Sequence, residues 1–307
     1  MRSRSRSSSN PKTENHNGSE MVRTAGEIGF CALQQLCDGE RPCVAPCGID
    51  EVDRWGGLLR RGDVSILFSR GAASRSSLAM QIVANVAMGG GDKERSGALV
   101  FTPQRTAEAY LRVMSGILAG VNWWRLSRRL VPKSEIAEYE KSYGSVVERL
   151  KSSGLFIEDE WRIGPDCMVR SARAANALKS LGVVMVDQLL DCNCGDNGES
   201  RIGWGVIGSR LKRIAKEFDV PIVALSSAST RELTLPAIMD GYGSMVDYVD
   251  HVVVMRKVQR SDNGVVSYAL DELTHVGDCV ESAIVKLDLN TLRLVESKVE
   301  AEIAKEI

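Results

Sequence analysis

Short apolar runs alternate with longer amphipathic stretches along most of this chain. The apolar runs are rich in Val, Ile and Leu and are bounded by turn residues, a pattern typical of buried strands. The predicted strands are Val64–Phe68, Ala98–Thr102, Leu155–Glu158, Val183–Asp187, Ile222–Ser226, His251–Met255 and Ser282–Lys286. The predicted helices are Ser76–Met88, Arg105–Leu118, Ser134–Lys151, Cys167–Leu181 and Gly203–Phe218. Such alternation forms right-handed βαβ units. We therefore expect an α/β fold with a mostly parallel sheet and helices on both faces.

The segments on either side of this alternation differ in composition. The N-terminal stretch is polar and rich in Arg and Ser, which predicts a disordered tail. Its Arg-Ser run leaves open contact with nucleic acid or phosphorylation, whereas a solvated tail requires neither. A short amphipathic helix is expected at Ala25–Asp38. The predicted organisation is a disordered tail at 1–24, a linker with this helix at 25–46, the main domain at 47–290 and a C-terminal extension at 291–307.

Composition excludes several classes of protein. The chain has 307 residues, a net charge of −1 and a pI of about 6.4, so it is not a strongly basic nucleic-acid binder overall, although a local basic face stays open. No apolar run approaches the roughly 20 residues that span a bilayer, and no apolar stretch typical of a secretory signal follows the N-terminal arginines. We expect no membrane partner and a soluble intracellular protein of the cytoplasm, the nucleoid or an organelle matrix.

The cysteines are loosely spaced and form no C-x-x-C pair. One interpretation of the first cluster is a zinc site, with Cys31, Cys37, Cys43 and Cys47 as ligands. The alternative is that all eight cysteines are reduced thiols, as is usual in intracellular proteins. We favour this second interpretation.

The first strand leads into the most informative stretch of the chain. It runs into the small-residue turn Ser69–Ser74 and then into a helix that starts near Arg75, which is the layout of a phosphate-binding loop. The usual loop reads G-x-x-x-x-G-K-[ST], whereas here both framing glycines are serines and the lysine is an arginine. Three interpretations stay open: a nucleotide site, a damaged one, or an ordinary strand-to-helix turn. The candidate phosphate-binding residues are Ser69, Gly71, Ala72, Ala73, Ser74, Arg75, Ser76 and Ser77.

A second candidate feature is the strand Val183–Asp187. Four apolar residues followed by Asp have the form of a Walker B strand, whose carboxylate holds Mg²⁺ directly or through water. Many buried parallel strands also end in Asp at a turn, but a phosphate-loop-like turn earlier in the chain favours the metal. The candidate Mg²⁺ ligands are therefore Ser76 and Asp187.

An ordered set of segments carries a resemblance to a known family: Gly48–Asp63, Ile66–Leu67, Leu78–Ile82, Leu155–Asp159, Val183–Asp187, Leu211–Ser226 and Gly243–Met255. With these segments, residues 47–287 resemble the RecA-like C-terminal ATPase domain of DnaB-type replicative hexameric helicases, within the wider RecA and RadA group. The resemblance implies a RecA-like P-loop NTPase fold and ATP with Mg²⁺ as cofactors. It also implies that residues 25–38 correspond to a linker helix that docks on a neighbouring subunit.

The departures from this family fall at its chemical positions. The phosphate-loop lysine aligns with Arg75, whose wide planar fork does not replace a compact ammonium in a tight loop. The catalytic glutamate aligns with Gln104, which orients a water but cannot accept its proton. The candidate catalytic residues are therefore Gln104, in place of the glutamate, and Asp187. Ser227 replaces a polar glutamine, and the arginine finger aligns with Asp288. A lost finger alone costs roughly 10³–10⁵ in rate in comparable enzymes.

Three functions fit this pattern. The first is a degenerate, non-hydrolysing pseudo-ATPase subunit or helicase-associated factor in DNA replication or recombination. It would bind a helicase or another replication or recombination protein, as a homo- or hetero-oligomer. The second is an atypical but active ATP-dependent DNA helicase, and the third is a scaffold that binds no nucleotide. The serine-rich loop argues against the second, and the retained Ser76 and Asp187 argue against the third, so we favour the first.

Single-stranded DNA has little support as a partner from the sequence. The loops that hold the strand in those helicases correspond to Cys192–Gly203 and Ser229–Gly243, which offer two arginines against four carboxylates. A groove that tracks phosphates needs more positive charge. More basic places are the Arg-Ser tail and the sequence Trp123, Trp124, Arg125, Arg128 and Arg129. The two tryptophans are expected to pack rather than to stack on bases.

Overall fold

The chain divides into two units, Met1–Arg41 and Pro42–Ile307. The computed structural model describes Ala25 and residues 45–55, 58–89, 94–161, 163–192, 203–227, 240–260, 263–273 and 279–295. All of these except Ala25 belong to the second unit. The predicted tail and nearly all of the predicted Ala25–Asp38 helix lie outside the described residues.

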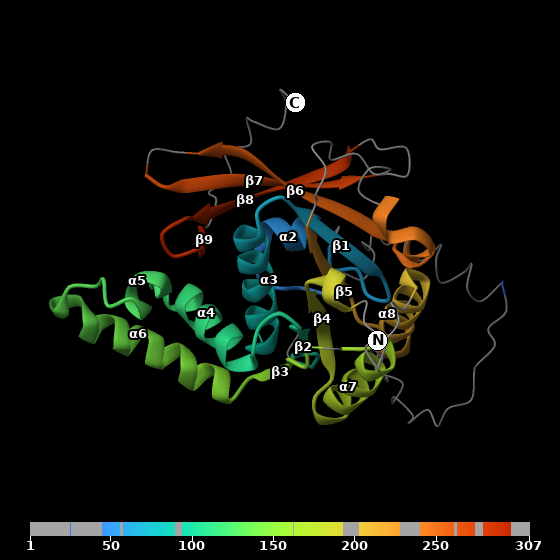
Figure 1. Cartoon of the computed structure of the whole chain (residues 1–307), viewed down its shortest axis with the longest axis horizontal. Coiled ribbons are helices and arrows are strands. Elements are labelled where there is room, and N and C mark those ends of the chain that lie inside the picture. Colours follow the sequence, from blue (N-terminus) through green and yellow to red (C-terminus); the bar gives the residue numbers. More distant parts are fainter. Residues whose placement is uncertain are drawn as a thin grey trace, which may run out of the picture. The chain divides into compact units, whose positions relative to one another are not determined.

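A mixed sheet organises the second unit. Within the described residues, nine strands form it in the order β3-β2-β4-β5-β1-β6-β7-β8-β9 (Figure 1). The first six strands in this order, from β3 to β6, run parallel to one another. Strands β7, β8 and β9 follow, each antiparallel to the strand before it. The bounds are β1 Val64–Ser69, β2 Gly97–Phe101, β3 Gly154–Glu158, β4 Leu181–Asp187, β5 Ile222–Ser227, β6 His251–Arg260, β7 Val265–Leu273, β8 Cys279–Asp288 and β9 Leu294–Val295. The predicted α/β class with a mostly parallel sheet is confirmed.

Helices cover both faces of the sheet and enclose two apolar cores. The helices are α2 Asp50–Trp55, α3 Ala72–Ala87, α4 Ala107–Ala119, α5 Trp123–Ser127, α6 Lys133–Lys151, α7 Pro165–Leu178 and α8 Trp204–Phe218, with 3₁₀ turns η1 Leu189–Cys192 and η2 Asp240–Tyr248. Helices α2, α3 and α4 pack on one face, and α7 and α8 pack on the other (Figure 1). Val183 of β4 faces the first core and Val184 faces the second, because successive strand side chains point to opposite faces.

Several elements differ from the predictions. Strands β7 and β9 and the short helix α5 were not predicted, and β9 lies inside the predicted C-terminal extension, where it pairs with β8. Helix α7 ends at Leu178, earlier than predicted, because Leu181 already belongs to β4. Helix α3 starts at Ala72, so the predicted turn Ser69–Ser74 is wrong in its second half. The longer predicted turn rested on a loop that would wrap a phosphate, whereas alanine and serine here continue the helix.

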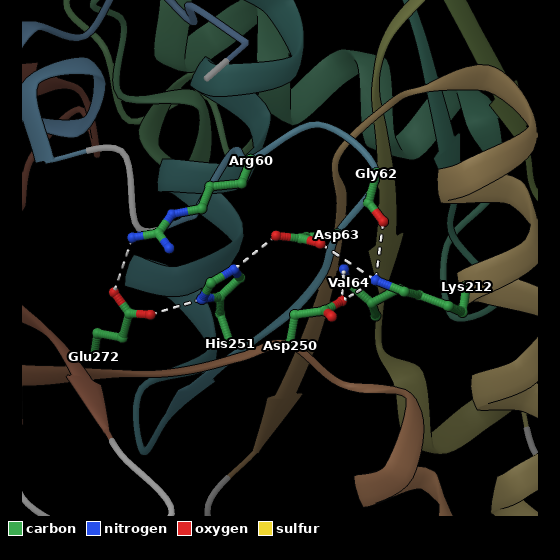
Figure 2. Close-up of polar contacts among 8 residues, drawn as sticks. All are labelled: Arg60, Gly62, Asp63, Val64, Lys212, Asp250, His251 and Glu272. Carbon is green, nitrogen blue, oxygen red and sulfur yellow. Dashed lines mark hydrogen bonds and ion pairs between the residues drawn. The ribbon is translucent and has the colours of Figure 1, made fainter. Parts of the chain in front are cut away.

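A charged network ties the strands together at the amino edge of the sheet (Figure 2). His251 lies between two carboxylates, with Nε2 3.0 Å from Asp63 Oδ2 and Nδ1 2.6 Å from Glu272 Oε1. Lys212 of α8 lies 3.2 Å from Asp63 and 2.5 Å from Asp250. Burial opposes charge on His251, but the hydrogen bonds to Asp63 and Glu272 outweigh it and raise the pKa of His251 to about 9. The network therefore links β1, β6, β7 and α8 while His251 is protonated.

None of the helices that the structure describes is long and apolar enough to cross a lipid bilayer.

Candidate functional site

The candidate site lies where four adjacent parallel strands reach their carboxyl ends. In the sheet order β2-β4-β5-β1, these ends carry Thr102, Asp187, Ser226 and Ser69. All four are buried. The carboxyl edge is where ligands bind in parallel sheets, and the candidate residues Ser69 and Asp187 both lie there.

The connection between β1 and α3 is short and largely satisfied by its own atoms. Ser69 Oγ accepts a hydrogen bond from the Gly71 N–H at 3.0 Å, so this amide already has a partner. Ser74 is buried and its hydroxyl donates to the Gly71 carbonyl at 3.1 Å. Ser77 donates to the Ala73 carbonyl at 2.6 Å, one turn back in α3. Three hydroxyl groups proposed for phosphate binding thus serve the local backbone.

Arg75 is the largest fully buried side chain of the site. It stands in the first turn of α3, and its Nη1 donates to the carbonyl oxygen of Ser69 at 3.1 Å and to the carbonyl oxygen of Ser226. Nη2 lies 3.3 Å from Ser227 Oγ. The guanidinium therefore bridges the carboxyl ends of β1 and β5. The sequence indicated a charged residue here but not that the fold would bury it.

Burial lowers the pKa of Arg75, and the nearby carboxylate of Asp187 partly opposes that shift. The Nε of Arg75 is buried without a hydrogen-bond partner. Arginine keeps its proton in proteins because its pKa is so high. The site thus contains a permanent, buried positive charge that its own backbone carbonyls solvate.

The proposed metal ligands do come together. Ser76 Oγ donates to Asp187 Oδ1 at 3.3 Å, and both side chains are buried. A hydroxyl and a carboxylate are the hard oxygen ligands that Mg²⁺ prefers. These two residues fit the metal part of a nucleotide site. The phosphate part fits poorly, because the Arg75 head group is turned onto carbonyl oxygens and the Gly71 amide is already used.

Sequence reasoning missed several polar groups near Asp187. The hydroxyls of Thr102 and Tyr110 are buried without a hydrogen-bond partner. Burial raises the pKa of Tyr110 well above its usual value, and the Asp187 carboxylate raises it further. Tyr242 of η2 is hydrogen-bonded to Ser226 through their hydroxyls and packs edge-on against the Phe68 ring. An aromatic hydroxyl at an otherwise apolar position of α4 was the available sequence signal for Tyr110.

The remaining candidates lie at the margins of the site. Gln104 is exposed in the connection between β2 and α4. Asp288, at the position of the expected finger, accepts hydrogen bonds from the Asn290 N–H at 2.8 Å and from Thr291 Oγ1 at 3.0 Å. It therefore stabilises the turn between β8 and β9. Most of the two predicted DNA loops, residues 193–202 and 229–239, lies outside the described residues.

Of the four cysteines in the zinc hypothesis, the structure describes only Cys47. Cys47 is buried, and burial raises its pKa well above the usual thiol value. Cys31, Cys37 and Cys43 lie outside the described residues. Within the described part of the chain, no group of three or more His, Cys, Asp or Glu side chains could hold a metal ion.

Comparison with known proteins gives a consistent picture. A family model described as "DnaB-like helicase C terminal domain" matches residues 45–240. The chain is 27% identical over 186 residues to the replicative DNA helicase DnaC of Bacillus subtilis, covering 60% of this chain and 39% of that protein. It is 26% identical over 194 residues to the replicative DNA helicase DnaB of Geobacillus stearothermophilus, covering 62% and 41%. The chain thus spans about two fifths of the length of these relatives.

Solved structures support the same fold. One of them, described as an ATPase domain, superposes with a TM-score of 0.72 at 15% identity, covering 90% of this chain and all of that one. A DnaB-like replicative helicase, described together with its interactions with primase, superposes with a TM-score of 0.71 at 15% identity, covering 94% and 69%. At this identity the likeness concerns the fold alone. The RecA-like architecture expected from the sequence is confirmed.

Proposed function

The chain belongs to the DnaB-like helicase C-terminal domain family, and we propose that it is a degenerate member that does not hydrolyse ATP appreciably. It would act in DNA replication or recombination as a pseudo-ATPase subunit or as a factor that associates with a helicase. The observation that carries this proposal is the position of Arg75. Its guanidinium is fully buried on the carbonyl oxygens of Ser69 and Ser226.

This arrangement competes with phosphate binding. To meet a phosphate, Arg75 would have to leave both carbonyl groups, and each buried polar group left unpaired costs about 1–3 kcal/mol. A phosphate-binding loop also uses backbone amides at the helix start, and Ser69 occupies one of them here, the Gly71 N–H. ATP would therefore bind weakly or not at all.

Two further features argue against turnover. Gln104 replaces the glutamate that would accept a proton from the attacking water. Asp288 at the finger position is held in a turn by Asn290 and Thr291, and it brings a negative charge. Each loss lowers the rate independently of Arg75, so repair of one position should leave the others limiting.

The partners follow from the family rather than from any contact in this chain. The relatives are replicative helicases, and one structural neighbour is described together with primase. We propose that this chain binds a helicase or another replication or recombination protein, in a homo- or hetero-oligomer. A domain that does not hydrolyse ATP would act in such an assembly by binding the other subunits.

One observation favours a second candidate, an atypical but active ATPase. Ser76 and Asp187 keep the hydroxyl–carboxylate pair that suits Mg²⁺. In addition, α3 starts at an exposed Gly71 without a side-chain cap, so amides of its first turn remain available for an anion. In this alternative a partner chain would complete the site.

ATP hydrolysis by the purified chain, with and without single-stranded DNA and Mg²⁺, separates the two candidates. We expect turnover far below about 1 s⁻¹, the low end of typical enzyme rates. Metal-dependent turnover at or above that rate, abolished by Asp187→Ala, would establish the active candidate instead. Arg213→Ala, an exposed change on α8, is the matched control.

A further inference from the structure

Helix α5 lies on the side of the sheet-containing unit away from α7 and α8 (Figure 1). Exposed basic and aromatic residues occur in and directly after this helix. We define this α5 corner by Trp124, Arg125, Arg128, Arg129, Leu130 and Lys133, all of which are exposed. Residues 121–134 contain four basic and no acidic side chains, in a chain whose net charge is −1. The corner thus carries four basic side chains, and the first carboxylate after it is Glu135 of α6. The candidate site at the sheet edge makes no use of this corner.

The two tryptophans at this place have different environments. Trp123 is partly buried and packs on Tyr143, with ring centroids 5.9 Å apart, as expected from the sequence. Trp124 is 55% exposed, so the expectation that it packs is wrong. The guanidinium carbon of Arg128 lies 4.4 Å from the Trp124 ring centroid. Trp124 therefore presents an exposed ring next to a guanidinium group.

The backbone of the corner is strained at a basic residue. The Leu130 N–H donates to the Arg125 carbonyl at 2.9 Å and the Arg129 N–H donates to the Leu126 carbonyl at 3.0 Å, which together form a Schellman motif. Arg129 occupies its left-handed position, with φ of 56°. Glycine is the residue that adopts this conformation without strain. An arginine at this position therefore carries a small conformational cost.

We propose that the α5 corner is a binding site for single-stranded nucleic acid. Trp124 offers a stacking surface for a base, and Arg128, Arg129 and Lys133 meet successive phosphates. No carboxylate of the described residues forms an ion pair with these three cations, so they are available to a polyanion. The site is separate from the β1–α3 connection and does not depend on whether ATP binds there.

An acidic protein segment fits the corner less well. A stable protein interface buries about 800 Å² on each partner and has an apolar centre. Only Trp124 and Leu130 supply exposed large apolar side chains in the corner. Isolated aromatic stacking surrounded by arginines is instead the pattern of single-strand binding surfaces.

The test measures how tightly the full chain, without ATP or Mg²⁺, binds a fluorescein-labelled oligothymidylate of about 20 nucleotides. This length exceeds the usual site of a single-strand binding fold. Trp124→Ala should weaken binding roughly 5- to 100-fold. Arg128→Ala and Arg129→Gly should each flatten the slope of log K against log salt by about 0.7. Arg129→Gly should do so while keeping or raising the melting temperature, which separates loss of binding from loss of folding.

Matched controls lie elsewhere on the surface. Trp161→Ala removes a tryptophan that is 67% exposed, and Arg213→Ala removes an exposed arginine on α8. Both should bind like the wild type. Wild-type affinity in all three corner variants, or no oligothymidylate binding by the wild type at low salt, overturns the proposal. Binding of an oligoglutamate peptide through Trp124 and Arg128 without oligothymidylate binding also overturns it, in favour of an acidic protein partner.

Discussion

Arg75 Nη1 donates a hydrogen bond to the carbonyl oxygen of Ser69 across 3.1 Å, and the side chain of Arg75 is fully buried. The residue that would hold a phosphate in a working loop is therefore part of the protein core. Its role is to solvate the ends of two strands. This relationship leads to expectations about stability as well as about nucleotide binding.

Arg75→Ala should destabilise the fold by about 2–4 kcal/mol, because it removes the donor that Arg75 supplies to two buried carbonyl groups and leaves a space in the core. A residue that only binds phosphate would show little effect. Urea unfolding measures the difference. The matched control is Arg70→Ala, an exposed change in the same connection, which should cost less than about 1 kcal/mol. Equal, small losses in both variants would mean that Arg75 is not a core residue.

The double variant Arg75→Lys with Gln104→Glu should still hydrolyse ATP slowly. It restores the two residue types that the resemblance calls for, but Ser69, Ser74 and Asp288 remain. Steady-state hydrolysis with single-stranded DNA is the assay. Turnover of about 1 s⁻¹ would locate the defect in those two residues alone.

Stability should fall as pH rises from about neutral to alkaline because of His251. Its pKa is about 9 in the folded protein against 6.5 as the ordinary value, so folding favours the protonated form. The stabilisation is complete below pH 6.5 and is lost as pH rises through 9, with a total of about 3 kcal/mol. Urea unfolding across this range measures it.

His251→Gln should flatten this pH dependence because glutamine does not titrate. Glu272→Gln should shift the decline to lower pH, because one of the two carboxylates that raise the pKa of His251 is then neutral. The other charged groups of the network, Arg60, Asp63, Lys212 and Asp250, stay in place in both variants. A wild-type profile in His251→Gln would contradict the assignment.

Arg129→Gly should stabilise the protein by roughly 0.5–1 kcal/mol, because glycine adopts the left-handed conformation at this position without strain. Arg128→Gly is the matched control. Arg128 has an ordinary φ of −95°, so glycine there should destabilise by a similar amount. Melting temperatures measure both, and a loss of stability in Arg129→Gly would show that the arginine side chain itself supports the fold.

The apolar runs were sufficient to predict the parallel half of the sheet. Val183–Asp187 and Ile222–Ser226 are almost uniformly apolar because both faces of these strands are covered. Strand β7 was missed because its burial is irregular and it carries Asp271 and Glu272 among its apolar residues. A pattern of that kind does not distinguish a strand from a loop.

The orientation of Arg75 could not be predicted from the sequence. A basic residue at the lysine position indicated a phosphate contact, and only the three-dimensional arrangement places two backbone carbonyls within its reach. The exposed Trp124 is a similar case, because its neighbour Trp123 packs and the two have the same sequence context. Both depend on contacts between segments that sequence pattern does not encode.

Equilibrium binding of a fluorescent ATP analogue to the purified chain, with and without Mg²⁺, shows whether the β1–α3 connection holds a nucleotide. The buried Arg75 predicts no saturation up to about 1 mM, the upper end of usual enzyme KM values, and no effect of the metal. Tight binding that requires Mg²⁺ and is lost in Ser76→Ala and Asp187→Ala would contradict the account, because it would mean that the phosphate loop works despite Arg75.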